Sequence, residues 1–196
     1  MVNRARSTGL IVLIILTVLL LALPALAADP SGAETINQDQ DLAADYVWVL
    51  VCGFLVFFMQ AGFAMVEAGF CRAKNATNLL SKNLMDFVMA SLVFLAVGYA
   101  LMKGEDAAGL FGTTGWFLYG EAYDVGTYLD FFWQLVFAGT AATIVAGAMA
   151  ERLKFPAYLI YSVVVSSLIY PLYGHWVWGG GWLSQLPFGV GHVDFA

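Results

Sequence analysis

Three indoles beside a glycine-rich turn are the residues of this sequence best suited to chemistry. Residues 175–182 read His-Trp-Val-Trp-Gly-Gly-Gly-Trp. The face of an indole attracts a cation by about 0.5 to 2 kcal/mol, and acidic residues nearby would raise the local cation concentration. Tryptophan also gathers at membrane interfaces whatever the function of the protein. The segment therefore predicts either a site for a weakly hydrated monovalent cation or an interfacial aromatic belt.

No arrangement typical of an enzyme or of a metal centre accompanies this segment. The two histidines, His175 and His192, are separated by a glycine-rich stretch and have no metal-ligand spacing with Asp194. The sequence also has no Ser-His-Asp arrangement, no HExxH motif, no P-loop and no GxGxxG motif. We therefore expect neither an enzyme nor a bound metal or cofactor.

Three residues inside apolar stretches are weaker candidates. Phe137 would lie about seven residues into a helix, roughly 10 Å below its end, where a phenylalanine ordinarily packs or faces lipid. Glu67 and Asp86 lie near helix ends, where each acid could reach water or a base such as Lys82. An acid within a membrane is by default a functional candidate, because its burial is costly.

The apolar composition of the chain indicates what kind of structure positions these residues. Hydrophobic residues make up 61% of the 196 residues and charged residues 11%, against about 25% in soluble domains. With 8 Lys and Arg against 14 Asp and Glu, the chain offers no basic surface for nucleic acid. Two cysteines are too few for a disulfide framework, so both are expected to be free thiols. The chain is therefore predicted to be embedded in a lipid bilayer.

Two segments are predicted to precede the membrane helices. Residues 1–27 combine Arg4 and Arg6, a short uncharged run and a Pro-Ala-Leu-Ala end, which is typical of a signal peptide cleaved after Ala27. An uncleaved first membrane helix is the alternative. Residues 28–45 are polar and acidic without an apolar period, and they are predicted to be an external leader.

Four apolar stretches in residues 46–196 are long enough to cross the membrane. At about 1.5 Å per residue, about 20 residues cover a hydrocarbon core of about 30 Å. Glycines at 174 and 179–181 break the apolar pattern, so the fourth helix is expected to end near Tyr173, before an external loop. The predicted helices are about 46–70, 83–102, 131–150 and 155–173.

The charge of the loops predicts the orientation. The loops after the first and third helices hold five of the six basic residues of the mature chain, and the other loops hold only Lys103. Basic loops stay in the cytoplasm, so we expect a multi-pass protein of the cell (inner) membrane with an external mature N-terminus. In the third helix, Gly139, Thr143 and Gly147 recur every fourth residue and predict close packing against a neighbouring helix.

Four motifs, in this order, resemble those of the ammonium transporter (Amt/Mep/Rh) family. They are Arg-Ala-Lys-Asn at 72–75, Gly-Ala-Met-Ala-Glu-Arg at 147–152, Trp-Val-Trp-Gly-Gly-Gly at 176–181 and Asp-Phe-Ala at 194–196. The resemblance implies an all-α polytopic membrane fold of eleven helices with two inverted five-helix repeats, assembled as a homotrimer. Residues 46–196 would be its N-terminal part, with the first four transmembrane helices.

The resemblance also implies roles for three residues. Trp178 would bind ammonium in an external vestibule, Phe137 would gate the pore, and Asp194 would support the vestibule. Ammonium would lose its proton near the gate, and ammonia and the proton would pass a pair of facing histidines. Deprotonation is expected because burying a bare ion in an apolar pore has a far larger solvation cost than burying neutral ammonia. The implied partners are the bilayer, ammonium or methylammonium, and a PII signal protein bound through a C-terminal tail.

The position of Ala196 bears on what residues 1–196 are expected to do alone. It falls inside the Asp-Phe-Ala-Gly signature, and the family's pore histidines and second repeat lie downstream of that signature. We therefore expect residues 1–196 alone not to conduct ammonium. Two alternatives to a transporter stay open, namely the sensing part of a receptor fused to a signalling domain and the product of a truncated reading frame.

Overall fold

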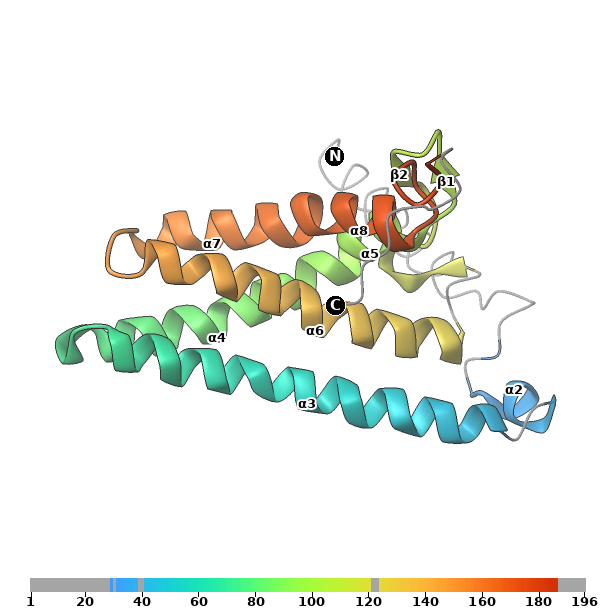
Figure 1. Cartoon of the computed structure of the whole chain (residues 1–196), viewed down its shortest axis with the longest axis horizontal. Helices are drawn as coiled ribbons and strands as arrows, with labels where there is room; N and C mark the ends of the chain where they lie inside the picture. The colour runs from blue at the N-terminus through green and yellow to red at the C-terminus, as the bar shows by residue number, and fades with distance from the viewer. Residues whose placement is uncertain (1–28, 30, 39–40, 121–123, 187–196) are drawn as a thin grey trace, which may run out of the picture.

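Four long helical segments lie side by side in the computed structural model (Figure 1). The structure describes residues 29, 31–38, 41–120 and 124–186. Within these ranges, four helices are long and apolar enough to cross a membrane, so the expected all-α fold with four spans is confirmed. The four spans are Leu42–Phe70, Ala73–Lys103, Val125–Met149 and Phe155–Trp178.

The first span begins earlier than the sequence suggested. The helix α3 runs over Asp41–Phe70, and a short helix α2 (Ala33–Gln38) precedes it within the expected leader. The Asp29 carboxylate accepts bonds from the backbone N–H and the hydroxyl of Thr35, at 2.9 and 3.0 Å, which anchors α2. Alanine and leucine at 42–44 favour the early start of α3. The predicted signal peptide, residues 1–27, lies outside the described residues.

The second and fourth spans each contain one wider, π-helical turn. The second consists of η1 (Ala73–Asn75), α4 (Ala76–Val93), η2 (Phe94–Gly98) and α5 (Tyr99–Lys103), and the fourth of α7 (Phe155–Val164), η5 (Val165–Ile169) and α8 (Tyr170–Trp178). The π turns η2 and η5 pack against each other. Pro171 lacks an N–H, and η5 ends two residues before it, where the helix ladder is interrupted.

The fourth span continues to Trp178 instead of ending near Tyr173. Gly174 does not break the helix, because it lies against α5, and a Cβ there would be 2.5 Å from Met102 Cε. The chain turns only after Gly179, where Gly180 has the positive φ of +83° that favours glycine. Three of the residues singled out for chemistry, His175, Trp176 and Trp178, are therefore helical.

The third span, α6 (Val125–Met149), also starts earlier than expected. Asp124 caps it by accepting a hydrogen bond from Gly126 N at 2.9 Å, and Asp130 lies within the helix instead of in the preceding loop. Between α5 and α6, a two-stranded antiparallel hairpin pairs β1 (Asp106–Ala107) with β2 (Phe111–Gly112), and a 3-10 turn η3 (Trp116–Leu118) follows.

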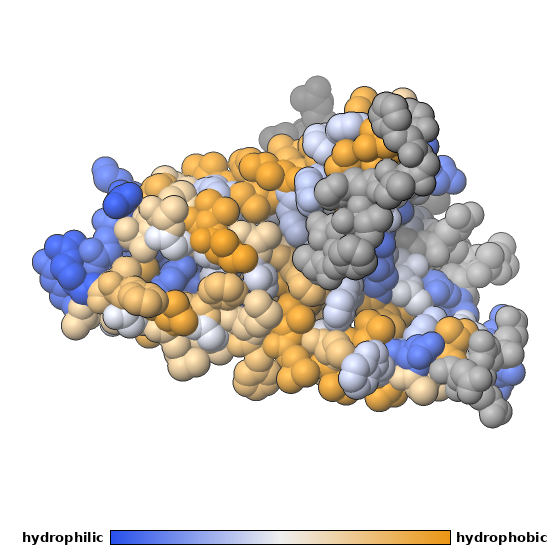
Figure 2. Space-filling view, in the orientation of Figure 1, coloured by the Kyte–Doolittle hydropathy of each residue, from blue (hydrophilic) through white to orange (hydrophobic). Residues whose placement is uncertain are grey.

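On the face seen in Figure 2, an apolar band covers the middle of the molecule and polar surface lies toward its ends. Much of the band comes from α3, whose Trp48, Phe58 and Phe70 are 68%, 73% and 89% exposed. The buried core lies elsewhere, among Phe94, Met102 and other residues of α5, α6 and η2. The small residues predicted to pack along one face of α6 do so only in part. Gly139 lies against Phe87 and Gln60, whereas Gly147 is exposed.

Candidate functional site

Phe137 of α6 and Trp178 of α8 line the same pocket, which has a volume of about 430 Å³. The two residues are 41 positions apart in the sequence, and the packing of the third and fourth spans brings them together. The third predicted site residue, Asp194, lies outside the described residues. The full lining consists of Lys103, Trp133, Gln134, Phe137, Thr140, Ala141, Ile144, Tyr170, Tyr173 and Trp178.

Two edge-to-face aromatic pairs hold the rings of this pocket. The centroids of Trp133 and Phe137 are 5.1 Å apart at 63°, and those of Tyr173 and Trp178 are 6.2 Å apart at 88°. Such geometry is favourable because the positive edge of one ring meets the negative face of the other. The wall therefore combines an indole and a phenol at the α8 end with Phe137 on α6.

Besides its tyrosine hydroxyls and indole N–H groups, the pocket has three polar side chains, a glutamine, a threonine and a lysine. Gln134 is buried and accepts a bond of 3.4 Å from the hydroxyl of Tyr170. The Lys103 ammonium lies 3.4 Å from Asp130 Oδ2, and Tyr99 donates to that oxygen at 2.9 Å. Because Asp130 partners the lysine, the pocket does not present an uncompensated positive charge that would repel a cation.

Sequence reasoning missed eight of these ten lining residues, although helical spacing offered a signal for some of them, such as Gln134 and Tyr170. Gln134 precedes Phe137 by three positions, and Tyr170 precedes Trp178 by eight, so each shares a helix face with a predicted site residue. Lys103 served only as a topology marker. Tyr173 was taken as the last residue of the fourth helix, where its contact with Trp178 was not foreseen.

A buried polar cluster lies on the other side of α6, between α3, α4 and α6. Thr143 Oγ1 is 2.9 Å from Gln60 Oε1, 3.0 Å from Asp86 Oδ2 and 2.9 Å from Gly139 O. A hydroxyl has one proton, so it donates to one of these oxygens and must accept from another neighbour. Turning the Gln60 amide would supply that donor, because its Nε2 has no other hydrogen-bond partner among the described residues.

The base expected to serve the two intramembrane acids bonds elsewhere. Lys82 Nζ donates to Leu153 O at 2.8 Å and lies 5.6 Å from the centroid of the Tyr158 ring. Glu67 Oε2 instead accepts from Asn83 Nδ2 at 2.8 Å, and Asp86 is 0% exposed. Neither acid lines the pocket of Phe137 and Trp178.

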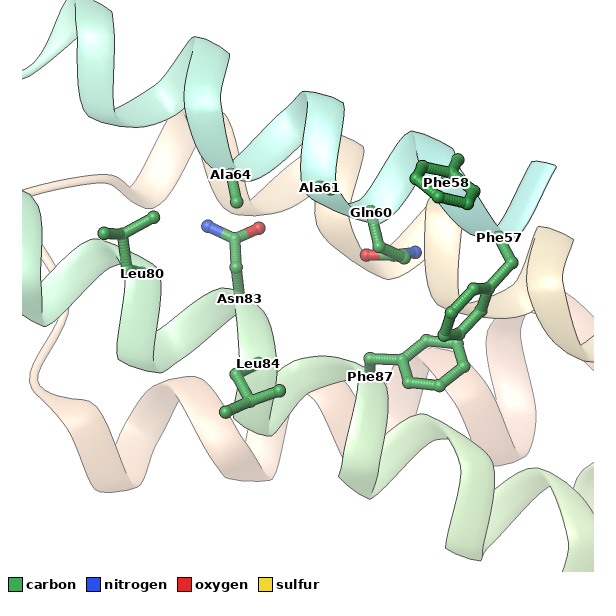
Figure 3. A pocket seen from close by; sticks show the side chains of 9 residues that line it. All are labelled: Phe57, Phe58, Gln60, Ala61, Ala64, Leu80, Asn83, Leu84 and Phe87. Carbon is green, nitrogen blue, oxygen red and sulfur yellow. The ribbon is translucent and has the colours of Figure 1, made fainter. Parts of the chain in front are cut away.

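A second pocket, of about 290 Å³, lies between α3 and α4 (Figure 3). The amides of Gln60 and Asn83 extend into the gap between the two helices, and the rest of the lining is apolar. It contains no charged side chain and neither of the predicted site residues. It therefore offers a cation less than the pocket between α6 and α8.

Two of the sequence motifs meet at the end of the bundle where α3 and α6 finish. Glu151 accepts bonds from Arg72 N at 3.0 Å and from Asn75 Nδ2 at 2.8 Å, and its Oε2 lies 2.9 Å from an Arg72 guanidinium nitrogen. These hydrogen bonds hold the pKa of Glu151 below its usual range, and the one from Asn75 has the largest effect. The contact places both basic loops at the same end, the left end in Figure 1.

The described residues hold no cluster of three or more His, Cys, Asp or Glu side chains suited to a metal. His175 instead bonds to the backbone of α5 and to the β1–β2 hairpin. His192 lies outside the described residues.

Comparisons with known proteins agree on one family. The model of the Ammonium Transporter Family matches residues 47–196. An ammonium transporter of Archaeoglobus fulgidus is 61% identical over 188 residues, which cover 93% of this chain and 40% of that protein. A putative ammonium transporter of Synechocystis is 46% identical over 151 residues, covering 74% of this chain and 34% of that protein.

A solved structure described as "Sensor Amt Protein" has a TM-score of 0.66 and 39% sequence identity, and the match covers 72% of this chain and 37% of that one. The chain thus spans 40% or less of the length of these relatives.

Proposed function

Because the chain belongs to the ammonium transporter family, whose members are transporters and not enzymes, we propose that it forms the N-terminal part of a pathway for ammonium across a membrane. The observation that carries the proposal is the convergence of Phe137 and Trp178 on one pocket from two different spans. A pathway needs a wall that recruits a cation and a constriction further along, and this pocket supplies a residue for each.

Recruitment is the role of the aromatic wall around Trp178. The indole face attracts a monovalent cation, and the phenol of Tyr173, in contact with Trp178, extends the same wall. Potassium and ammonium are similar as cations, so attraction alone does not separate them. Asp194 supports the vestibule without touching the ion, as the family resemblance implies.

Selectivity arises where the ion must leave water. Burying a bare ammonium ion in an apolar constriction carries a very large solvation cost, whereas neutral ammonia costs only about as much as an unpaired polar group. Phe137 forms the constriction, and ammonium gives up its proton before passing it. Metal cations have no proton to give up and are rejected at this point.

The orientation follows from the two basic loops, which the Glu151 contact joins at one end. We place that end in the cytoplasm and the end with Trp178 outside, with the mature N-terminus external after cleavage at Ala27. The complete protein assembles as a homotrimer and binds a PII signal protein through a C-terminal tail. Part of the exposed apolar face of α3 would then meet lipid or a neighbouring subunit.

Methylammonium uptake by cells that express the full-length protein tests the proposal. Trp178→Leu should raise KM by about 2-fold to 30-fold, which corresponds to a cation–π attraction of about 0.5 to 2 kcal/mol. Trp48→Leu is the matched control, because Trp48 is an exposed indole on α3, away from the pocket. Equal KM values for the two variants would exclude Trp178 as the recruiting residue.

Phe137→Ala tests the gate in the same assay. Opening the constriction should admit water and lower the discrimination between methylammonium and potassium. Phe58→Ala, on the exposed face of α3, is the control and should leave the discrimination unchanged. Unchanged discrimination in Phe137→Ala would contradict the proposed gate.

An ammonium sensor is the second candidate function, because the similar solved structure is described as a sensor. A sensor would bind ammonium at the same aromatic wall and pass the signal to a further domain. Saturable ammonium binding by the purified full-length protein, without methylammonium uptake above an empty-vector control, would favour the sensor over the transporter.

A further inference from the structure

The buried imidazole of His175 touches two oxygen atoms, one through each ring nitrogen. Nδ1 lies 3.0 Å from Met102 O, at the end of the second span, and Nε2 lies 2.9 Å from Asp106 Oδ1 in the hairpin strand β1. The histidine is 0% exposed, whereas the Asp106 side chain is 35% exposed. The pair therefore connects the interior of the α5–α8 contact with the surface of the hairpin.

These contacts determine how many protons the imidazole holds. A carbonyl oxygen and a carboxylate oxygen both only accept hydrogen bonds, so both contacts are hydrogen bonds only if each ring nitrogen donates one. A neutral imidazole has a single N–H and can satisfy only one of the two oxygens. The arrangement fits the imidazolium form, with one N–H toward Met102 and the other toward Asp106.

The contacts of Asp106 in the hairpin favour its ionised, carboxylate form. The hydrogen bond from His175 is the largest influence that lowers the pKa of Asp106 below its usual range. Gly109 N also donates to both carboxylate oxygens, at 2.8 and 2.9 Å. Asp106 thus remains ionised, and its charge compensates the buried imidazolium.

The pair sits among contacts that fasten the end of α8 to the hairpin. Trp176 Nε1 donates to Leu110 O at 2.8 Å, and Trp182 N donates to Gly109 O at 3.0 Å. The carbonyl of His175 accepts from Gly179 N at 3.0 Å and from Gly181 N at 2.9 Å, which closes the helix end. Trp178 lies between these points, on the last turn of α8.

We propose that His175 and Asp106, as a buried imidazolium–carboxylate pair, are positioning residues that hold Trp178 in the wall of the pocket. The pair touches neither the pocket nor a passing ion. It fixes the last turn of α8 against α5 and the hairpin, and thereby fixes where the indole faces. This inference rests on the proposed recruiting role of Trp178.

The protonation of His175 is tested directly by nitrogen NMR. The full-length protein is labelled with ¹⁵N-histidine, and the signals of His175 are identified as those lost in His175→Gln. Asp106→Asn, a change at a partly exposed side chain, shifts the same signals and identifies them if His175→Gln does not fold. Two protonated ring nitrogens at neutral pH are expected, and one bare nitrogen would overturn the charged pair.

The effect on Trp178 is tested with two matched substitutions of Asp106. Asp106→Asn keeps a hydrogen-bond partner for Nε2, because its amide can donate to the neutral imidazole that is left when the compensating charge is removed, so we expect its KM for methylammonium within about twofold of the wild type. Asp106→Leu removes the acceptor and should raise KM about fivefold with Vmax nearly unchanged. Glu105→Gln removes the charge of the neighbouring residue, which is not part of the pocket lining, and its KM should change less than that of Asp106→Leu.

Fluorescence separates this inference from the transport proposal. The emission of Trp178 is taken as the difference between each protein and the same protein carrying Trp178→Phe. We expect this emission to shift in Asp106→Leu and to return in Asp106→Asn, whether or not the protein takes up methylammonium. An unshifted emission in Asp106→Leu would overturn the positioning role. A shifted emission in a protein that shows no uptake would instead refute the proposed transport while leaving the positioning intact.

Discussion

The contact between the two π turns depends on the absence of a side chain at Gly98, so Gly98→Ala should separate the second and fourth spans. A Cβ at Gly98 would lie 2.7 Å from the backbone oxygen of Ser166 and 2.5 Å from the Phe94 ring. Ordinary van der Waals contact begins at 3.4 Å, so the Ser166 backbone would have to retreat by about 0.7 Å. Phe94 is itself 0% exposed and has little room to move.

The expected cost is the difference between two opposing effects. Overpacking of a close contact costs about 1 to 3 kcal/mol, whereas replacing glycine by alanine within a helix gains about 1 kcal/mol. We therefore expect Gly98→Ala to lower the free energy of unfolding by up to about 2 kcal/mol. Gly62→Ala in α3 is the matched control, because a Cβ there meets nothing within 4 Å. Its expected effect is neutral to slightly stabilising.

The assay is unfolding of the full-length protein in mixed micelles with increasing sodium dodecyl sulfate, followed by circular dichroism. Because Lys103 and Trp178 lie beyond the contact on these two spans, methylammonium uptake should fall in Gly98→Ala as well. If Gly98→Ala and Gly62→Ala unfold at the same detergent fraction, the close approach of the π turns does not determine the packing, and the reasoning is refuted.

Three further predictions concern polar contacts. Thr143→Val should lower the free energy of unfolding by about 1 to 3 kcal/mol in the same titration, since it leaves buried partners unsatisfied. Thr140→Val should cost less, because among the described residues the Thr140 hydroxyl bonds to Val136 O of its own helix. The pKa of Glu151 in the folded protein lies below its ordinary value of 4.5. The contribution of Glu151 to the free energy of unfolding is therefore complete above pH 4.5 and is lost as the pH falls through the folded-state pKa. Glu151→Gln should remove this part of the acid dependence of unfolding. Asp130→Asn should leave the charge of Lys103 uncompensated beside the pocket and raise KM for methylammonium, measured by uptake at low ionic strength.

Each of these predictions has an opposite outcome that would contradict it. Equal losses in Thr143→Val and Thr140→Val would mean that the interhelical bonds add nothing to stability. An acid dependence that is the same with and without Glu151 would show that the contact with Arg72 does not stabilise the fold. A KM that is unchanged in Asp130→Asn at low salt would place the Lys103 charge outside the path of the cation.

The ends of the helices show where local sequence is insufficient. Gly174 looked like a helix breaker because glycine has a low helix propensity, yet tertiary packing on Met102 keeps it helical. Asp130 looked like a loop residue because it is charged, yet Tyr99 and Lys103 of another span satisfy it within α6. In both cases, the deciding partner lies in a different element, which a window of sequence does not contain.

The sequence by itself determined the number of spans, the membrane setting and the family, because the length of an apolar run, the count of charges and short motifs are local properties of the chain. Only the tertiary structure decided which residues meet. It brought Phe137 and Trp178 to one pocket, joined Glu151 to Arg72 across 79 positions, and placed Asp106 on His175 across 69. Apolar helices of similar composition could pack in many ways, and the choice among them depends on close contacts such as those at Gly98 and on buried hydrogen bonds whose two partners come from separate spans.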